Sequence, residues 1–314
     1  MSKGHENTTS TRHEVGIGVR MPSTPPRTTL LLALAVIVLA VGGEWVLAAV
    51  YGENEVACRP ASLPASLVDI PEASGVAASH LTPNLLWTIN DSGAPRLFAL
   101  DENGDRKGAV TVAQARITDW EDVSISRCAT GSCVYIGDIG DNDARRSTLV
   151  LYRLPEPSPH EKTRQADRME VRYPDGPRDA EAMFVLPDGQ IYVISKESPA
   201  IVYRTAQFTP GTTATLERVM TLPFGHITDA EASADGRRVV MRTKEEAIFY
   251  RTDDLVHGDV GHGTVFPVMP LSEPQGEGIT FGSGDSVFTI GEGGGKKAPG
   301  TFLRLECPVP GARP

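Results

Sequence analysis

The chain has 314 residues, 40% hydrophobic and 22% charged, so it is long and apolar enough to bury a core. Its formal charge is −10, and residues 1–29 carry four Lys or Arg against two Glu, which leaves −12 on the rest. This acidity excludes nucleic acid as an expected partner, because phosphate binding relies on clustered Lys and Arg. The 31 Gly and 24 Pro are scattered along the chain and favour many short strands over a helical bundle.

The first 51 residues are predicted to direct export. Residues 1–29 are polar and precede twelve uncharged residues from Leu30 to Val41. A short break at Glu44 is followed by a second apolar stretch, so the span 30–51 is long enough to cross a bilayer. The positive flank keeps residues 1–29 in the cytoplasm as the n-region of a signal sequence.

This span allows two localisations. As an uncleaved signal-anchor helix, residues 30–51 make the chain a single-pass protein of the cell membrane with an extracytoplasmic C-terminal domain, which is the prediction we favour. Cleavage after Ala48 as a signal peptide would make the protein secreted. We expect a linker over residues 52–64, a folded part over 65–308 and a tail over 309–314.

Four cysteines follow the apolar span, and an even number in an exported chain predicts two disulfides. Cys128 and Cys133 enclose four residues, the length of a hairpin tip, which predicts a local bridge. Cys58 and Cys307 are then left to pair at the two ends of the folded part. The competing hypothesis, a metal site, lacks the second Cys-x-x-Cys or paired His that would support it.

The folded part contains a unit that recurs every 46–60 residues, roughly the length of one propeller blade. Each unit begins with a strand that changes from acidic to apolar, at residues 72–78, 119–125, 179–185, 229–233 and 275–281. Second strands are expected at 86–89, 134–136, 191–194, 239–241 and 287–290. Third strands are expected at 96–100, 149–153, 201–204, 248–251 and 301–304.

These repeats predict an all-β fold, a β-propeller, because units of about four strands must pack against their neighbours. Outer, fourth strands are expected at 108–112, 168–173, 216–222 and 264–269. The fifth unit lacks one, and residues 65–70 can supply it by pairing the beginning of the folded part with its end. A Cys58–Cys307 bridge would staple that closure, so we predict five blades; six blades, one of them unrecognised, is the alternative.

Several motifs resemble those of a largely uncharacterised group of exported bacterial β-propeller proteins, loosely near the phytase-like and calcium-dependent esterase or lactonase propellers. These motifs are Trp87-Thr-Ile-Asn90-Asp91, Asp119-Trp-Glu-Asp122, Gly137-Asp-Ile-Gly-Asp-Asn142, Asp179-Ala-Glu181-Ala and Gln275-Gly-Glu277. The resemblance covers about residues 70–306 and implies the fold. It implies no catalytic residues, because many propellers of this kind only bind ligands.

Period-two alternation places the acidic ends of the first strands at one mouth of a central channel. We predict that four equivalent carboxylates form a partial ring of metal ligands there: Glu121, Glu181, Glu231 and Glu277. The same mouth should receive candidate ligand-contacting residues from strand ends: Asn90, Asp91, Asp119, Asp138, Asp141, Asn142, Lys196 and Glu292. Converging carboxylates must hold a cation or change their pKa values, and Ca²⁺ suits oxygen ligands in loops.

Two functions are compatible with these residues. The first is a membrane-anchored, monomeric binding module for a small molecule or protein, with Ca²⁺ at the mouth. The second is a Ca²⁺-dependent hydrolase of phosphoester or lactone substrates, in which Asp138 or Glu121 positions water. A structural alternative is that the repeated carboxylates accept hydrogen bonds from the backbone of the adjacent blade. No Gly-x-Ser-x-Gly, His-Glu-x-x-His or catalytic cysteine pattern assigns a catalytic residue.

Overall fold

The computed structural model describes residues 57–308 apart from 269–272, 285 and 296–297, together with two short strands, β1 (Ala40–Val41) and β2 (Glu44–Trp45). The chain divides into two units, Met1–Glu55 and Val56–Pro314. In the first unit β1 pairs antiparallel with β2. The rest of the predicted anchor, the n-region and the tail lie outside the described residues. No helix of the described part is long and apolar enough to span a membrane.

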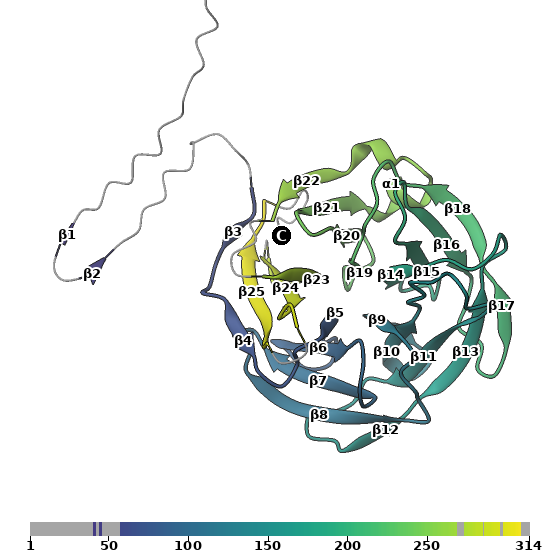
Figure 1. The fold of residues 1–314 in the computed structure, drawn as a ribbon, viewed down its shortest axis with the longest axis horizontal. Coiled ribbons are helices and arrows are strands. Elements are labelled where there is room, and N and C mark those ends of the chain that lie inside the picture. Colours follow the sequence, from purple (N-terminus) through teal and green to yellow (C-terminus); the bar gives the residue numbers. More distant parts are fainter. Residues whose placement is uncertain are drawn as a thin grey trace, which may run out of the picture. The chain divides into compact units, whose positions relative to one another are not determined.

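The second unit is a five-bladed β-propeller, as predicted, with five sheets around one axis (Figure 1). From the axis outwards, blade 1 has β5 (Ala73–Ala78), β6 (Leu85–Asn90), β7 (Arg96–Asp101) and β8 (Arg106–Ala113), and blade 2 has β9 (Trp120–Cys128), β10 (Gly131–Asp138), β11 (Leu149–Pro155) and β13 (Asp167–Arg172). Blade 3 has β14 (Ala180–Val185), β15 (Ile191–Ser195), β16 (Ile201–Thr205) and β18 (Glu217–Thr221), and blade 4 has β19 (Asp229–Ala232), β20 (Arg238–Arg242), β21 (Glu246–Arg251) and β22 (Thr264–Pro267). Blade 5 has β23 (Gln275–Phe281), β24 (Ser286–Glu292) and β25 (Gly300–Glu306).

The core is divided among the interfaces between blades. Five apolar clusters each combine side chains from two neighbouring sheets. Trp87 of blade 1 and Trp120 of blade 2, for example, are fully buried in the same cluster. Alternating side chains on both faces of each sheet therefore have a neighbouring blade to pack against, which is why the strands are apolar along most of their length.

The ring is closed by the start of the folded part, as predicted. Strand β4 (Ala65–Leu67) pairs with β25 through Gly300 and Leu67, and β3 (Arg59–Pro60) extends the same edge through Leu305 and Pro60. The predicted linker 52–64 thus contains a strand. The Cys58–Cys307 disulfide, with Cα atoms 4.2 Å apart, adjoins this pairing, and the Cys128–Cys133 bridge closes the hairpin between β9 and β10. Both predicted pairings are confirmed.

Two edge strands were not predicted. Strands β12 (Thr163–Gln165) and β17 (Thr213–Thr215) each lie in the connection before an outer strand, and each pairs in parallel with the outer strand of the preceding blade. They cover edges that would otherwise expose unpaired backbone groups. The matching connection of blade 4 instead forms α1 (Thr252–Val256) and the 3₁₀ turn η1 (Val260–His262).

Loss of the closing disulfide is expected to destabilise the propeller more than loss of the hairpin disulfide. Because Cys58 and Cys307 are 249 residues apart and Cys128 and Cys133 only 5, loop-closure entropy predicts losses of about 5 and about 2 kcal/mol, respectively. Thermal unfolding of the two double Cys→Ala variants tests this ranking. Equal shifts of the two melting temperatures would contradict the role of the closing bridge.

Candidate functional site

The inner strands of four blades carry a bulge near the end where they begin. The pairing register skips one residue in β5, β9, β14 and β23, and the skipped residues are Gly75, Glu121, Glu181 and Glu277. A bulge redirects the side chain of the extra residue. Three of the four predicted ring carboxylates therefore occupy the same position in blades 2, 3 and 5.

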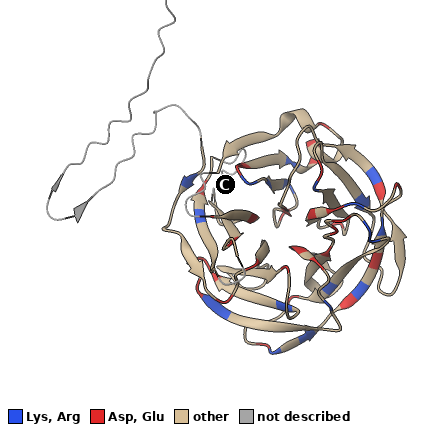
Figure 2. Ribbon diagram, in the orientation of Figure 1, with Lys and Arg blue, Asp and Glu red and all other residues tan. Residues whose placement is uncertain are grey.

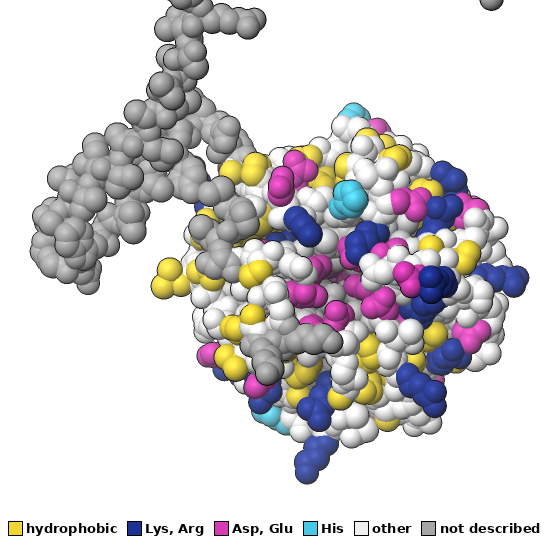
Figure 3. Space-filling view, viewed as in Figure 1, with side chains coloured by type: hydrophobic (Ala, Val, Ile, Leu, Met, Phe, Trp, Pro, Cys, Tyr) yellow, Lys and Arg dark blue, Asp and Glu magenta, His cyan; other side chains and the backbone are white. Residues whose placement is uncertain are grey.

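We call the end of the axis at which these strands begin the acidic mouth. Figure 3 shows Asp and Glu side chains gathered around the hollow centre of the ring on this side, and Figure 2 marks Asp and Glu positions on the strands around the axis. A pocket of about 580 Å³ opens there between blades 3, 4 and 5. Its lining includes Glu181, Lys196, Phe224, His226, Lys244 and Glu277.

Lys196, which follows β15, neutralises part of this charge. Its Nζ forms an ion pair with Glu181, lies 3.5 Å from Asp179 Oδ2 and 3.5 Å from Asn142 Oδ1. Partial burial opposes the charged form of Lys196, but the contacts with Glu181 and Asp179 outweigh it and raise the lysine pKa. Glu181 and Asp179 thus already have a cationic partner.

Glu121 and Glu277, in contrast, form no ion pair in the described part of the chain. Among the residues that the structure describes, neither carboxylate forms an ion pair or accepts a hydrogen bond. Burial, followed by the negative charges of Asp119 and Glu181, raises the pKa of Glu121 to about 10. Burial, followed by Glu181 and Glu292, raises the pKa of Glu277 to about 8. Both groups hold a proton near neutral pH unless positive charge arrives.

The carboxylates continue towards blade 1. Burial, followed by Glu72 and Glu292, raises the pKa of Asp91 to about 7, and burial and Glu72 also raise the pKa of Glu292. Gln275 Nε2 donates to Glu292 Oε2 at 2.7 Å. The Oδ1 atoms of Asn90 and Asp91 are buried without a hydrogen-bond partner. The mouth therefore has unused acceptors on this side as well.

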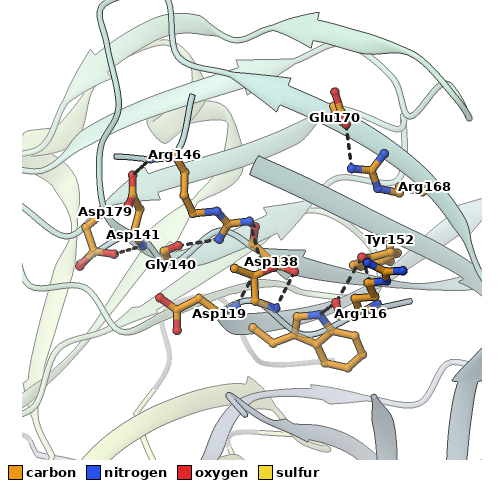
Figure 4. A network of polar contacts seen from close by, with 12 residues as sticks. Arg116, Asp119, Asp138, Gly140, Asp141, Arg146, Tyr152, Arg168, Glu170 and Asp179 are labelled. Carbon is orange, nitrogen blue, oxygen red and sulfur yellow. Dashed lines mark hydrogen bonds and ion pairs between the residues drawn. The ribbon is translucent and has the colours of Figure 1, made fainter. Parts of the chain in front are cut away.

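Asp138, the last residue of β10, and Asp141, in the loop that follows, are both held by hydrogen bonds (Figure 4). Asp138 is buried and accepts hydrogen bonds from the Thr118 and Asp119 N–H groups at 3.1 and 3.2 Å and from Arg146 Nη2 at 2.7 Å. Asp141 accepts the N–H groups of Arg145 and Arg146. Both side chains therefore position the loop, and neither projects freely into the mouth.

This loop sets the spacing of the neighbouring carboxylates. The Asp141 N–H donates to Asp179 Oδ1 at 2.7 Å. A Cβ atom at Gly140 would come within 2.4 Å of the Asp119 and Glu121 carboxylates, so only glycine allows both to pack against this backbone. Burial and Asp179 raise the pKa of Asp119. The loop thus crowds like charges that would otherwise separate.

Glu231 lies apart from the other predicted ring residues. Strand β19 has no bulge, so Glu231 pairs with Val240, whereas the register skips its sequence counterpart Glu181. It is buried, its Oε1 accepts the Ile125 N–H at 3.2 Å, and it lines a pocket at the opposite end of the axis. Its neighbourhood is therefore different from that of the acidic mouth.

Sequence reasoning missed two fully buried carboxyl groups on the axis. Asp229 Oδ2 accepts the N–H groups of Ile279 and Val76 at 2.6 and 3.3 Å, and Asp122 Oδ2 accepts the Met183 N–H. Burial raises the pKa of both groups, and the nearby charge of Asp229 raises that of Asp122 further, so the pair shares a proton. Each joins its own blade to others, as the structural alternative describes. Strict alternation of side chains could not place Asp122 on the axis, because the bulge at Glu121 changes which of the later side chains in the strand face the axis.

The described part of the chain contains no group of three or more His, Cys, Asp or Glu side chains placed so that it could hold a metal ion. The carboxylates of the acidic mouth are spread around the ring rather than focused on one point.

The chain matches no family model and no curated protein sequence. Solved propeller structures are similar in fold. A gluconolactonase from Xanthomonas campestris is 12% identical, with 80% of this chain and 96% of that chain covered and a TM-score of 0.45. The PQQ-bound aldose sugar dehydrogenase of Streptomyces coelicolor is 9% identical, with 80% and 98% covered and a TM-score of 0.47.

Replacing Glu277 by Gln is expected to stabilise the protein near neutral pH. The folded state retains a proton that the unfolded chain releases above its ordinary pKa of 4.5, so the wild type loses stability as the pH rises from 4.5 to about 8. Glutamine carries no such proton, so Glu277→Gln gains on the order of 1–3 kcal/mol at about pH 7 and nothing at about pH 4. Thermal unfolding at both pH values measures the difference.

The exposed pocket residue Glu245 supplies the control, since Glu245→Gln should leave the melting temperature unchanged. A gain in Glu277→Gln that is the same at both pH values would show that burial of the Glu277 proton is not its cause.

Proposed function

We propose that the protein is a binding module that takes a positively charged ligand at the acidic mouth. The observation that carries this proposal is that two carboxyl groups, Glu121 and Glu277, have like charges as their main neighbours and form no ion pair among the described residues. A ligand cation would supply the charge that Lys196 supplies to Glu181. Its binding would release the protons that the two groups retain near neutral pH.

An organic ammonium group fits this arrangement better than a bare metal ion. An ammonium group needs about one or two carboxylates at hydrogen-bonding distance, whereas Ca²⁺ takes roughly six to eight oxygen ligands. The pocket beside Glu277 has about 580 Å³ and includes Phe224, Thr228 and Thr243, which suits a small organic molecule. Ca²⁺ at the mouth is the second ligand to test.

Hydrolysis is the second candidate function. Glu277, with its pKa of about 8, lies on the same pocket as Glu181, which is ion-paired with Lys196. Two carboxyl groups with different protonation are the arrangement that general acid and base catalysis requires. Release of product from phosphoester or lactone substrates, lost in Glu277→Gln, would support this function over binding alone.

We place the propeller outside the cytoplasm. Its two disulfides support this placement, because such bonds persist in oxidising compartments. The apolar span 30–51 would hold the monomeric propeller at the membrane, or would be cleaved to secrete it. The acidic mouth would then meet ligands of the extracytoplasmic medium.

Calorimetric titration of the full chain with 1,4-diaminobutane and, separately, with Ca²⁺ tests the proposal. We expect saturable binding accompanied by proton release, with affinity rising by up to about tenfold per pH unit below about pH 8, because Glu277 must ionise. Glu277→Gln should bind about tenfold more weakly, the loss typical of one charged contact. Glu245→Gln is the matched control for general charge.

Binding of neither cation would overturn the proposal, as would equal affinities of the two Gln variants. Tighter binding of Ca²⁺ than of the diamine would assign the mouth to a metal ion.

A further inference from the structure

A second pocket, of about 390 Å³, lies at the end of the axis opposite the acidic mouth. It is lined by residues where inner strands end and second strands begin, including Ala78, Leu86, Ala232, Arg238, Phe281 and Phe288. Blades 4, 5 and 1 therefore form its walls. We call this end the second mouth, and none of the functional proposals above uses it.

Glu231 lines this pocket and has an unsatisfied oxygen. The side chain is only 2% exposed, and Oε1 accepts the Ile125 N–H. Among the described residues Oε2 is buried and accepts no hydrogen bond, although the Ser124 hydroxyl is near the carboxyl group and partly opposes the rise in its pKa that burial causes. An unpaired buried carboxyl oxygen is costly, so such a group is expected to have a partner in the functional state. Glu231 thus offers one polar contact to a molecule in the pocket.

Arg238 offers a second polar contact to a molecule in the pocket. Its guanidinium carbon lies 4.9 Å from the centre of the Phe281 ring, and its Nη1 is buried without a hydrogen-bond partner in the described part of the chain. No ion pair of Arg238 occurs among the described residues. Stacking fixes the plane of the guanidinium and leaves its fork free for an oxyanion.

The other charged groups of the pocket are already occupied. Asp235 accepts hydrogen bonds from the Ser233 hydroxyl at 2.6 Å and from the Arg237 N–H at 3.0 Å. Glu102 lies 3.8 Å from Arg304 Nη1. Burial lowers the pKa of His80, which favours the neutral ring. Hydrogen bonds from Ser233 and from the Arg237 N–H, together with the charges of Arg237 and Arg238, lower the pKa of Asp235. Arg238 is near this carboxylate but forms no ion pair with it, so it is the one Lys or Arg of this pocket without an ion pair in the described structure.

We propose that the second mouth binds a small hydroxy acid, whose carboxylate or phosphate pairs with Arg238 and whose hydroxyl bonds to Glu231. The oxyanion accepts two N–H groups of the guanidinium, while the hydroxyl satisfies the free Glu231 oxygen. A molecule with both groups uses both unsatisfied positions at once. This ligand differs in charge from the one proposed for the acidic mouth, so the two sites can be tested separately.

Titration of the full chain with malate, succinate and glycerol 3-phosphate tests this site. Malate and succinate differ by one hydroxyl, so malate should bind about fivefold more tightly, the effect of one hydrogen bond. Arg238→Gln should weaken binding of malate by about tenfold or more. The adjacent Arg237, whose side chain is 85% exposed and does not line the pocket, gives the control variant Arg237→Gln, with unchanged affinity.

Three further variants keep the test decisive. Arg238→Lys retains the charge and should fold normally. It should bind malate more weakly than the wild type, because lysine lacks the planar guanidinium fork. Glu231→Gln keeps a polar group towards the hydroxyl and should preserve the preference for malate, whereas Glu231→Leu should remove it. Tighter binding of glycerol 3-phosphate than of malate would identify phosphate as the oxyanion, and the reverse a carboxylate.

The proposal is wrong if malate and glycerol 3-phosphate both fail to bind at about 10 mM, a weak limit for a specific site, or if Arg238→Gln and Arg237→Gln bind malate equally. Glu277→Gln should not change malate affinity, so failure here leaves the proposal for the acidic mouth intact.

Discussion

Closure of the ring is the constraint on which the rest of this structure depends. Strand β4, from the start of the folded part, completes blade 5 beside β25, and the Cys58–Cys307 disulfide holds the same edge. Without this pairing the last interface would lose its outer layer and the first and fifth blades could separate. With it, five inner strands are forced to begin around one narrow axis. The crowding of carboxylates at the acidic mouth is a direct consequence.

Carboxyl groups have different roles in the middle of the axis and at its acidic mouth. In the middle, Asp122 and Asp229 accept backbone N–H groups of neighbouring blades, so they stabilise the ring while sharing a proton. At the acidic mouth the bulge residues Glu121 and Glu277 face like charges instead, which are offset in part by Lys196 near Glu121 and by Arg242 and Lys244 near Glu277. Carboxyl groups thus join the blades in the middle of the axis, whereas those at the acidic mouth remain available to a ligand.

Much of the fold could be predicted because its signals are local. Turn residues and alternation marked four strands per unit, and the missing outer strand of the fifth unit pointed to residues 65–70 and to the cysteine pairing. Strands β12 and β17 could not be predicted, since each has three residues and its only strand partner belongs to the preceding blade. Asp138 and Asp141 likewise looked like free loop carboxylates until their backbone partners were known.

By itself, the sequence determined the five units, both disulfides and the carboxylates that begin each inner strand. Only the tertiary structure decided which of those carboxylates meet. Glu181 and Glu231 share the same local motif, yet a bulge directs the first to the acidic mouth, and its absence in β19 directs the second to the opposite pocket. The physical reason is that a bulge is set by pairing with another strand, and a pKa by charges from other blades, neither of which a local pattern contains.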